Sequence, residues 1–254
     1  MWLIKDAHVV DPAQEIDRTC DVLFDDTIIA IGTDLSDKDI PDADSSLSIV
    51  NAAGKYLFPG LVDVHTHLRE PGREDKEDIA SGSRAAVRGG FTTILAMANT
   101  QPVIDNRGLV EFVLRQGERA KGARVLPVAA VTMGLQGNEL VNMAELHKAG
   151  AVAFADDGRG MQRAQTMLLA LQYARLTGCP LISHCENESL AAGGSMRRGP
   201  RSARLGLAGI PASAESVMAA RDVLLAQECG GKLHLAHLST AAAVLALRWG
   251  KQQG

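Results

Sequence analysis

The stretch Asp63–Gly72, DVHTHLREPG, places two histidines one residue apart, directly after the apolar run YLFPGLV. Successive side chains of a β-strand alternate between its two faces, so His65 and His67 share one face while Thr66 takes the other. Two imidazoles on one face suit a metal ion. A pair of histidines hydrogen-bonded in a polar loop would also explain an isolated His-x-His, so the rest of the chain has to decide between the two.

From Tyr56 onward, apolar runs alternate with helical stretches, a rhythm that favours parallel strands joined by helices. We count six such strand-helix units. The predicted strands are YLFPGLVDVHTH (56–67), FTTILAMAN (91–99), RVLPVAAVT (124–132), AVAFADDG (151–158), CPLISHCEN (179–187) and KLHLAHLS (232–239). The predicted helices are 77–88, 107–121, 138–148, 162–176, 213–228 and a last one from about residue 239, and several end at a glycine that can cap them.

The first 56 residues follow a different pattern. Short β runs at 2–10, 20–32 and 46–56 are separated by polar turn material such as TDLSDKDIPDADSS (33–46). The chain is therefore predicted to be an α/β protein with a small β unit over residues 1–56, followed by a strand-helix series over residues 57–254.

Four of the six predicted strands end in residues able to bind metal. In a barrel of parallel strands the carboxyl ends converge on one face, so ligands far apart in sequence meet in space. The other histidines lack this placement: His8 lies in the opening β unit, His147 on a helix and His234 at the start of a strand, so we interpret them as structural. The candidate ligands are His65 and His67, the pair Asp156 and Asp157, His184, and His237.

Strand alternation reduces the number of candidate metal ligands. Adjacent residues of a regular strand cannot both point into a barrel, so at most one of Asp156 and Asp157 is a ligand unless the turn at Gly158 relaxes the rule. Cys185, beside His184, carries a thiol that zinc would accept. Alternation places it on the opposite face from His184, and we interpret it as a buried thiol.

Composition excludes several classes of function. The formal net charge is -4 with both signs interspersed, which gives no electrostatic footprint for nucleic acid or an anionic membrane. No apolar run reaches the roughly 18 residues of a membrane span, and the N-terminus lacks a secretory pattern. The four cysteines form no C-x-x-C pair. We expect a cytoplasmic protein that acts on a small molecule.

With DVHTHLREPG, FADDG, SHCE and LAHLS in this order, the sequence resembles the amidohydrolase superfamily, and within it the dihydroorotases of the bacterial long-chain type. The segments AAVRGGFTTILAMANTQPV (85–103) and GLAGIPASAESVMAARDVLLA (206–226) are more specific than the histidines alone. The resemblance implies a TIM-like (β/α) barrel and a small β-sandwich domain to which residues 1–56 contribute. Hydantoinase relatives typically carry a carboxylated lysine at strand four, and AVAFADDG has none.

Carried over by position, the resemblance implies that five residues bind Zn²⁺, one ion or two: His65, His67, Asp157, His184 and His237. Arg69 and Asn99 would hold the substrate carboxylate. The implied activity is the reversible hydrolysis of dihydroorotate to N-carbamoyl-aspartate in pyrimidine biosynthesis. Zinc suits this reaction because it lowers the pKa of a bound water to about 7 and polarises a carbonyl. The resemblance also allows a homodimer and an aspartate transcarbamoylase partner.

One feature departs from the family pattern. The family has eight barrel strands and a proton-shuttling aspartate at the end of the eighth, whereas this sequence stops after the sixth and residues 238–254 contain no Asp or Glu. We therefore identify no catalytic acid-base residue, and expect the front portion of a longer enzyme that is not fully active alone. The alternatives are an allantoinase or hydantoinase, and a noncatalytic scaffold for aspartate transcarbamoylase, against which the intact His65 and His67 argue.

Overall fold

The computed structural model describes residues 1–36, 39 and 46–254. Its internal contacts divide the chain into two compact units, Met1–Gly60 and Leu61–Gly254, which are described separately below. Most of the polar turn predicted over 33–46 lies outside the described residues.

The first unit is a small β-sheet. Its strands are β1 (Trp2–Asp11), β2 (Ile16–Phe24), β3 (Ile28–Gly32), β4 (Ser48–Asn51) and β5 (Tyr56–Leu57). The order is β3-β2-β1-β4, with β5 also paired to β1. The predicted run 20–32 is two antiparallel strands rather than one, because the chain turns at Asp25, whose N–H donates to the carbonyl of Thr27. That this unit belongs to a β-sandwich stays a prediction.

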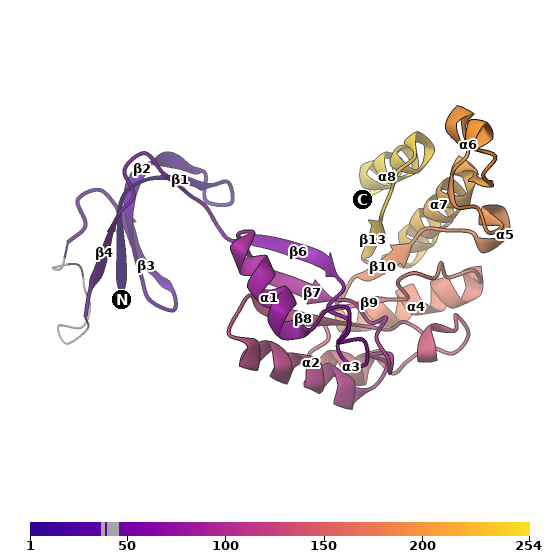
Figure 1. The fold of residues 1–254 in the computed structure, drawn as a ribbon, viewed down its shortest axis with the longest axis horizontal. Coiled ribbons are helices and arrows are strands. Elements are labelled where there is room, and N and C mark those ends of the chain that lie inside the picture. Colours follow the sequence, from indigo (N-terminus) through magenta and orange to yellow (C-terminus); the bar gives the residue numbers. More distant parts are fainter. Residues whose placement is uncertain (37–38, 40–45) are drawn as a thin grey trace. The chain divides into compact units, whose positions relative to one another are not determined.

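The second unit contains six parallel strands, and this confirms the predicted α/β barrel-type series. They are β6 (Leu61–Thr66), β7 (Phe91–Ala96), β8 (Arg124–Ala129), β9 (Ala153–Ala155), β10 (Leu181–His184) and β13 (Leu233–Ala236). Each strand pairs in parallel with the next along the chain. Figure 1 shows that these strands curl, with helices on their outer side. β6 begins at Leu61, not at Tyr56, because Pro59 has no N–H for a strand ladder.

Helices join the strands in the predicted order. They are α1 (Ile79–Arg88), α2 (Arg107–Ala120), α3 (Met143–Ala149), α4 (Ala164–Thr177), α7 (Ala212–Cys229) and α8 (Ala241–Gln253). Gly150, Gly178 and Gly230 end α3, α4 and α7 in the left-handed conformation, as the glycine pattern predicts. α3 begins five residues later than predicted, because a 3₁₀ turn (Met133–Leu135) and a bridge from Thr132 to Leu140 precede it.

Short elements that the sequence pattern did not predict lie between β10 and α7. They are α5 (Glu188–Ala191), β11 (Met196–Arg197), α6 (Pro200–Leu205) and β12 (Gly209–Ile210), and β11 pairs in parallel with β12. Together they carry the chain from the end of β10 to the start of α7. Their apolar residues are too few to show a helical or strand period, which explains why periodicity missed them.

Alternation along the strands separates an inner from an outer apolar layer. Ala153 and Ala155 belong to one buried cluster, whereas Phe154 between them belongs to the cluster packed under the helices. Val128 and Ala129 of β8 divide in the same way. Small side chains on the inner face leave room at the carboxyl ends of the strands. In the described part of the chain, no helix combines the length and apolar character needed to cross a membrane.

Candidate metal centre

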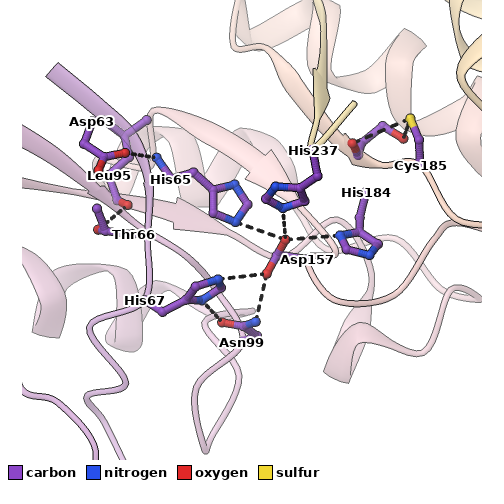
Figure 2. A network of polar contacts seen from close by, with 11 residues as sticks. Asp63, His65, Thr66, His67, Leu95, Asn99, Asp157, His184, Cys185 and His237 are labelled. Carbon is purple, nitrogen blue, oxygen red and sulfur yellow. Dashed lines mark hydrogen bonds and ion pairs between the residues drawn. The ribbon is translucent and has the colours of Figure 1, made fainter. Parts of the chain in front are cut away.

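The five predicted ligands meet at the carboxyl ends of the parallel strands. His65 lies near the end of β6 and His67 directly after it, Asp157 follows β9 by two residues, His184 is the last residue of β10, and His237 follows β13. Because parallel strands all end at one edge of the sheet, residues 172 positions apart in sequence come together here (237 − 65). Figure 2 shows four imidazoles turned toward one carboxylate.

Asp157 stands at the centre of this cluster. Its Oδ1 lies 3.2 Å from His65 Nε2, 3.6 Å from His184 Nδ1 and 3.5 Å from His237 Nε2, and its Oδ2 lies 3.4 Å from His67 Nε2. The ring of His237 is edge-on to that of His65, with centroids 4.5 Å apart, and also to that of His184 at 5.3 Å. The nitrogens therefore surround one small volume next to the carboxylate.

The cluster leaves buried polar atoms without partners. His65 Nδ1 has no hydrogen-bond partner among the described residues, and His65 Nε2 and His184 Nδ1 face Asp157 Oδ1 at 3.2 and 3.6 Å without forming a hydrogen bond. Buried polar groups are nearly always satisfied, so such atoms need an explanation. A cation bound between them supplies one, because neutral imidazole and carboxylate are favoured ligands of divalent transition metals. Ligand atoms of His65, Asp157 and His237 lie within 4.8 Å of one another, which is close enough to hold one ion. The residues present therefore fit a metal.

Electrostatics in the cluster favour a neutral His65 and an ionised Asp157, whereas the contact with Asp157 raises the pKa of His184. Burial lowers the pKa of His65, and the neighbouring imidazoles of His237, His67 and His184 act in the same direction against Asp157. Burial alone would raise the pKa of Asp157, but the surrounding histidines, His184 foremost, outweigh it and bring the pKa down to about 2. Metal binding requires an unprotonated imidazole and an ionised carboxylate. At neutral pH, His65 and Asp157 are already in those states.

Asn99 fixes the orientation of His67. The Nδ2 of Asn99 donates to Asp157 Oδ2 at 3.0 Å, and since an ionised carboxylate only accepts, the amide oxygen must face His67 Nδ1, also at 3.0 Å. His67 Nδ1 then carries a proton and Nε2 points toward Asp157. An unprotonated Nε2 at 3.4 Å from a carboxylate oxygen would be repelled unless a cation, or a second proton, lay between them. The contact between His67 Nδ1 and the Asn99 amide oxygen is the outer hydrogen bond that metal-binding histidines commonly make.

The two adjacent aspartates have separate surroundings. Asp156 turns away from the histidines into the core, where its Oδ1 accepts from the N–H groups of Val131 (2.8 Å) and Thr132 (3.0 Å), and its Oδ2 accepts from the Thr132 hydroxyl. It therefore holds the chain after β8. Asp157 faces the cluster, as strand alternation predicts for one member of the pair. Its role as a metal ligand stays a prediction.

The other predicted residues divide between the cluster and its surroundings. Arg69 is half-buried in the loop after β6, with a left-handed backbone (φ 61°). Gly72 in the same loop passes so close to Gln101 that a Cβ would lie 1.7 Å from its carbonyl oxygen. Cys185 is buried with its Sγ against Ser183, and burial raises its pKa to about 12, as expected of an inert thiol. Binding of a substrate carboxylate by Arg69 and Asn99 stays a prediction.

Sequence reasoning missed a cavity of about 250 Å³ beside the cluster. His184 and His237 line it together with Glu186, Arg197 and Glu215. Arg197 comes from β11 and Glu215 from the first turn of α7. No short motif marks either residue, since the segments that bring them to the site have no clear period. The segment GIPASAE, which the resemblance singles out, contains Glu215 and was the only available signal.

Comparison with known proteins identifies the family. A family model described as "Dihydro-orotase-like" matches residues 54–243. The chain belongs to the dihydro-orotase-like family. Among curated relatives, a dihydroorotase of Syntrophobacter fumaroxidans is 45% identical over 255 residues, covering 100% of this chain and 57% of its own length. One of Pelobacter propionicus is 47% identical over 253 residues, covering 99% of this chain and 58% of its own length. The chain thus spans somewhat more than half the length of the relatives it matches.

Solved structures support the fold. L-hydantoinase from Arthrobacter aurescens aligns with a TM-score of 0.78 at 23% identity, covering 100% of this chain and 56% of that one. A D-hydantoinase from Thermus sp. aligns with a TM-score of 0.70, also at 23% identity and with the same coverage. At this identity the likeness concerns the fold, and it agrees with the curled sheet of six parallel strands.

Proposed function

We propose that the chain carries the metal centre of a dihydroorotase, which reversibly hydrolyses the cyclic amide of dihydroorotate to N-carbamoyl-aspartate in pyrimidine biosynthesis. The observation that carries the proposal is the convergence of four imidazoles on Asp157 at the carboxyl ends of four strands, in a chain whose curated relatives are named dihydroorotase. The metal we propose is zinc, because the donor set is imidazole and carboxylate.

The bound metal would supply a Lewis acid for the ring carbonyl and a water of lowered pKa. His65, His67, Asp157, His184 and His237 would hold it, and one ion or two fit this number of donors. Asp157, with its pKa of about 2, remains an acceptor throughout the neutral range. Asn99 keeps His67 in the tautomer whose Nε2 faces the centre. The protein's own contribution is therefore an ionised Asp157 and a His65 of lowered pKa, with the imidazoles already directed at one carboxylate before substrate arrives.

Substrate orientation is assigned to Arg69. Its guanidinium would bind the dihydroorotate carboxylate bidentately, which places the ring amide at the centre. Asn99 was expected to assist, but both ends of its amide already contact His67 and Asp157. We therefore propose that Asn99 reaches a substrate only by giving up one of these contacts. A group that protonates the leaving nitrogen is not assigned within residues 1–254.

Two other functions remain as rivals. The hydantoinase neighbours point to a different cyclic amide, but their identity supports only the fold. A noncatalytic scaffold for aspartate transcarbamoylase would not need four histidines directed at one carboxylate. Together with dihydroorotase activity we propose a cytoplasmic location and a small-molecule substrate. We also propose that the protein forms a homodimer and binds an aspartate transcarbamoylase. Light scattering of the protein alone and mixed with the transcarbamoylase tests the dimer and the complex.

The deciding experiment measures metal and turnover on the same preparation. The protein is purified in a version extended to the length of its curated relatives, stripped with chelator, reloaded with zinc and analysed for metal by mass spectrometry. Turnover is then assayed on dihydroorotate, hydantoin and allantoin, and in reverse on N-carbamoyl-aspartate. We expect one or two zinc ions per chain and a preference for dihydroorotate. Faster turnover of hydantoin would favour the rival enzyme, zinc binding without turnover of any substrate would favour the scaffold, and no bound metal would refute the proposal.

A further inference from the structure

Glu215 gathers four hydrogen bonds from the two residues that follow His237 by two and three positions. The N–H groups of Ser239 and Thr240 each donate to Oε1 at 2.9 Å, and the Thr240 hydroxyl donates to the same oxygen at 2.8 Å. The Ser239 hydroxyl donates to Oε2 at 2.5 Å. One carboxylate on α7 therefore binds the whole turn between β13 and α8.

The hydrogen bonds from Glu215 matter because His237 lies at the end of an outer strand and has an unfavourable backbone conformation. β13 is an outer strand of the six-strand sheet, paired with β10. His237 has a left-handed backbone (φ 58°), a conformation that costs free energy in a residue other than glycine and persists only when its surroundings impose it. Its side chain is 50% exposed, against 6% for Asp157. Packing alone therefore constrains His237 less than any buried member of the cluster.

A second carboxylate on α7 works in the same way. Asp222 is fully buried, and its Oδ2 accepts from the Ser183 hydroxyl at 2.6 Å, one residue before His184. Glu215 and Asp222 are seven residues apart, which is two turns, so they lie on the same face of the helix. α7 thus holds both strands that deliver His184 and His237, through one acidic residue for each.

We propose that Glu215 is a positioning residue for His237: by binding the turn at Ser239 and Thr240 it aims the imidazole at the metal centre and so sets the affinity for metal. The inference rests on the proposed function, since it needs the cluster to bind metal. The competing explanation is helix capping. Thr240 is the N-cap of α8, where its Oγ1 accepts from Ala243 N–H at 3.2 Å, so Glu215 could serve only to stabilise that helix.

Four variants of the 254-residue chain separate these explanations. Glu215→Ala removes all four contacts, and Glu215→Asp withdraws the carboxylate by one methylene. Glu215→Gln keeps the Oε1 acceptor of three contacts and can donate to the Ser239 hydroxyl. Glu228→Gln, on the exposed far end of the same helix, is the matched control. Zinc affinity is measured by competition with a chromogenic chelator, and the unfolding of the metal-free proteins is followed by circular dichroism.

The expected result is that Glu215→Ala weakens zinc binding about 10- to 100-fold, the range for losing a group that orients a metal ligand; Glu215 orients His237 through Ser239 and Thr240 and not by direct contact. The zinc affinity of Glu215→Asp should lie between those of Glu215→Ala and the unmodified chain. Glu215→Gln and Glu228→Gln should bind zinc as tightly as the unmodified chain. A readout free of metal accompanies this: in the ¹H–¹⁵N spectrum of the metal-free imidazoles, Glu215→Ala should shift His237 and leave His8 and His147 unchanged.

Unmodified affinity in both Glu215→Ala and Glu215→Asp, or an unshifted His237, would overturn the inference in favour of helix capping. A Glu215→Gln protein as weak as Glu215→Ala would also overturn it, because hydrogen-bond geometry would not be the cause. If Glu215→Ala fails to fold, Glu215→Asp decides. Absence of zinc binding in the unmodified chain would refute the proposed function instead, while the imidazole spectrum would still test the contact.

Discussion

The centre and the edges of the parallel sheet hold their site residues by different means. β8 and β9 lie inside the sheet, and Phe154 of β9 is 0% exposed. Among the described residues β6 is an outer strand, where Val62 is 56% and Val64 40% exposed. Asp157 and His184 come from the inner strands β9 and β10, whereas His65, His67 and His237 come from β6 and β13, the outer strands among the described residues. The site therefore joins two ligands from inner strands to three from strands that are packed on fewer sides.

At the outer strands β6 and β13, polar contacts hold the ligands where packing is less complete. Asn99 orients His67, and Glu215 binds the turn after His237, whereas Asp157 follows a strand buried between two neighbours. At the centre the corresponding polar contacts belong to Asp156 and hold the fold itself. This division predicts that substitutions at the centre affect ligand charge or overall stability strongly, and that substitutions at the edges affect metal affinity in smaller steps.

The largest effect is expected from Asp157→Asn. The amide keeps the shape of the side chain but removes the carboxylate that all four imidazoles face, so zinc affinity should fall at least about a hundredfold, beyond the range for an outer partner. Metal content after dialysis against zinc measures it. Asp156→Asn is the control one residue away, and an equal loss of zinc in both variants would contradict the assignment of the ligand to Asp157.

The second prediction concerns the neighbour that faces the core. Asp156→Ala leaves two buried N–H groups and a hydroxyl without their acceptor, so we expect the free energy of unfolding to fall by about 3 kcal/mol. Urea denaturation of the metal-free protein measures this change. Asp75→Ala, on an exposed loop, should leave the midpoint unchanged. A stable Asp156→Ala protein would show that the chain after β8 is held by other contacts.

These two aspartates also mark how far sequence reasoning reaches. The strand-helix rhythm and the placement of His65, His67, His184 and His237 after apolar runs predicted their convergence, because strand period and barrel geometry depend on local pattern. Alternation stated that one aspartate faces inward but could not choose; the choice of Asp157 came from the family resemblance. In the structure, the N–H groups of Val131 and Thr132 bind Asp156 and leave Asp157 facing the histidines. These two donors lie 25 and 24 residues from Asp156 in sequence.

What the sequence did not predict depends on irregular backbone. The elements between β10 and α7 are two to six residues long, too short to show a hydrophobic period. The left-handed backbone at His237 could not be predicted either, because that position is not a glycine. Glu215 reaches its partners across 24 and 25 positions through side-chain hydrogen bonds. Contacts of this kind are set by tertiary packing, so a single sequence carries no local sign of them.

A third prediction tests the loop after β6. Gly72 adopts φ 93°, and a Cβ there would meet the Gln101 carbonyl at 1.7 Å, so Gly72→Ala must displace backbone as well as strain its own. We expect a loss of about 2 kcal/mol in the free energy of unfolding. Gly137→Ala is the matched control, since it has φ 72° with nothing within 4 Å of the added Cβ, and should cost less. Equal losses would mean that backbone strain alone accounts for the effect and that the close approach is irrelevant.

The smallest effect is expected at the edge, from Asn99→Ala. The substitution frees His67 Nδ1 from its acceptor and removes the donor to Asp157 Oδ2, so His67 can rotate or change tautomer. Zinc affinity should fall about tenfold, the lower end of the range for an outer partner, because His67 remains present and can still bind.

Asn99→Asp sharpens the test: its carboxylate can still accept from His67 but cannot donate to Asp157, and it adds a negative charge beside the cation. Tighter zinc binding by Asn99→Asp than by Asn99→Ala, measured by chelator competition, would show that an acceptor for His67 and the added charge together outweigh the lost contact to Asp157. Affinity unchanged in both variants would mean that the outer strand holds His67 without help, and the contrast between centre and edge would fail at that strand.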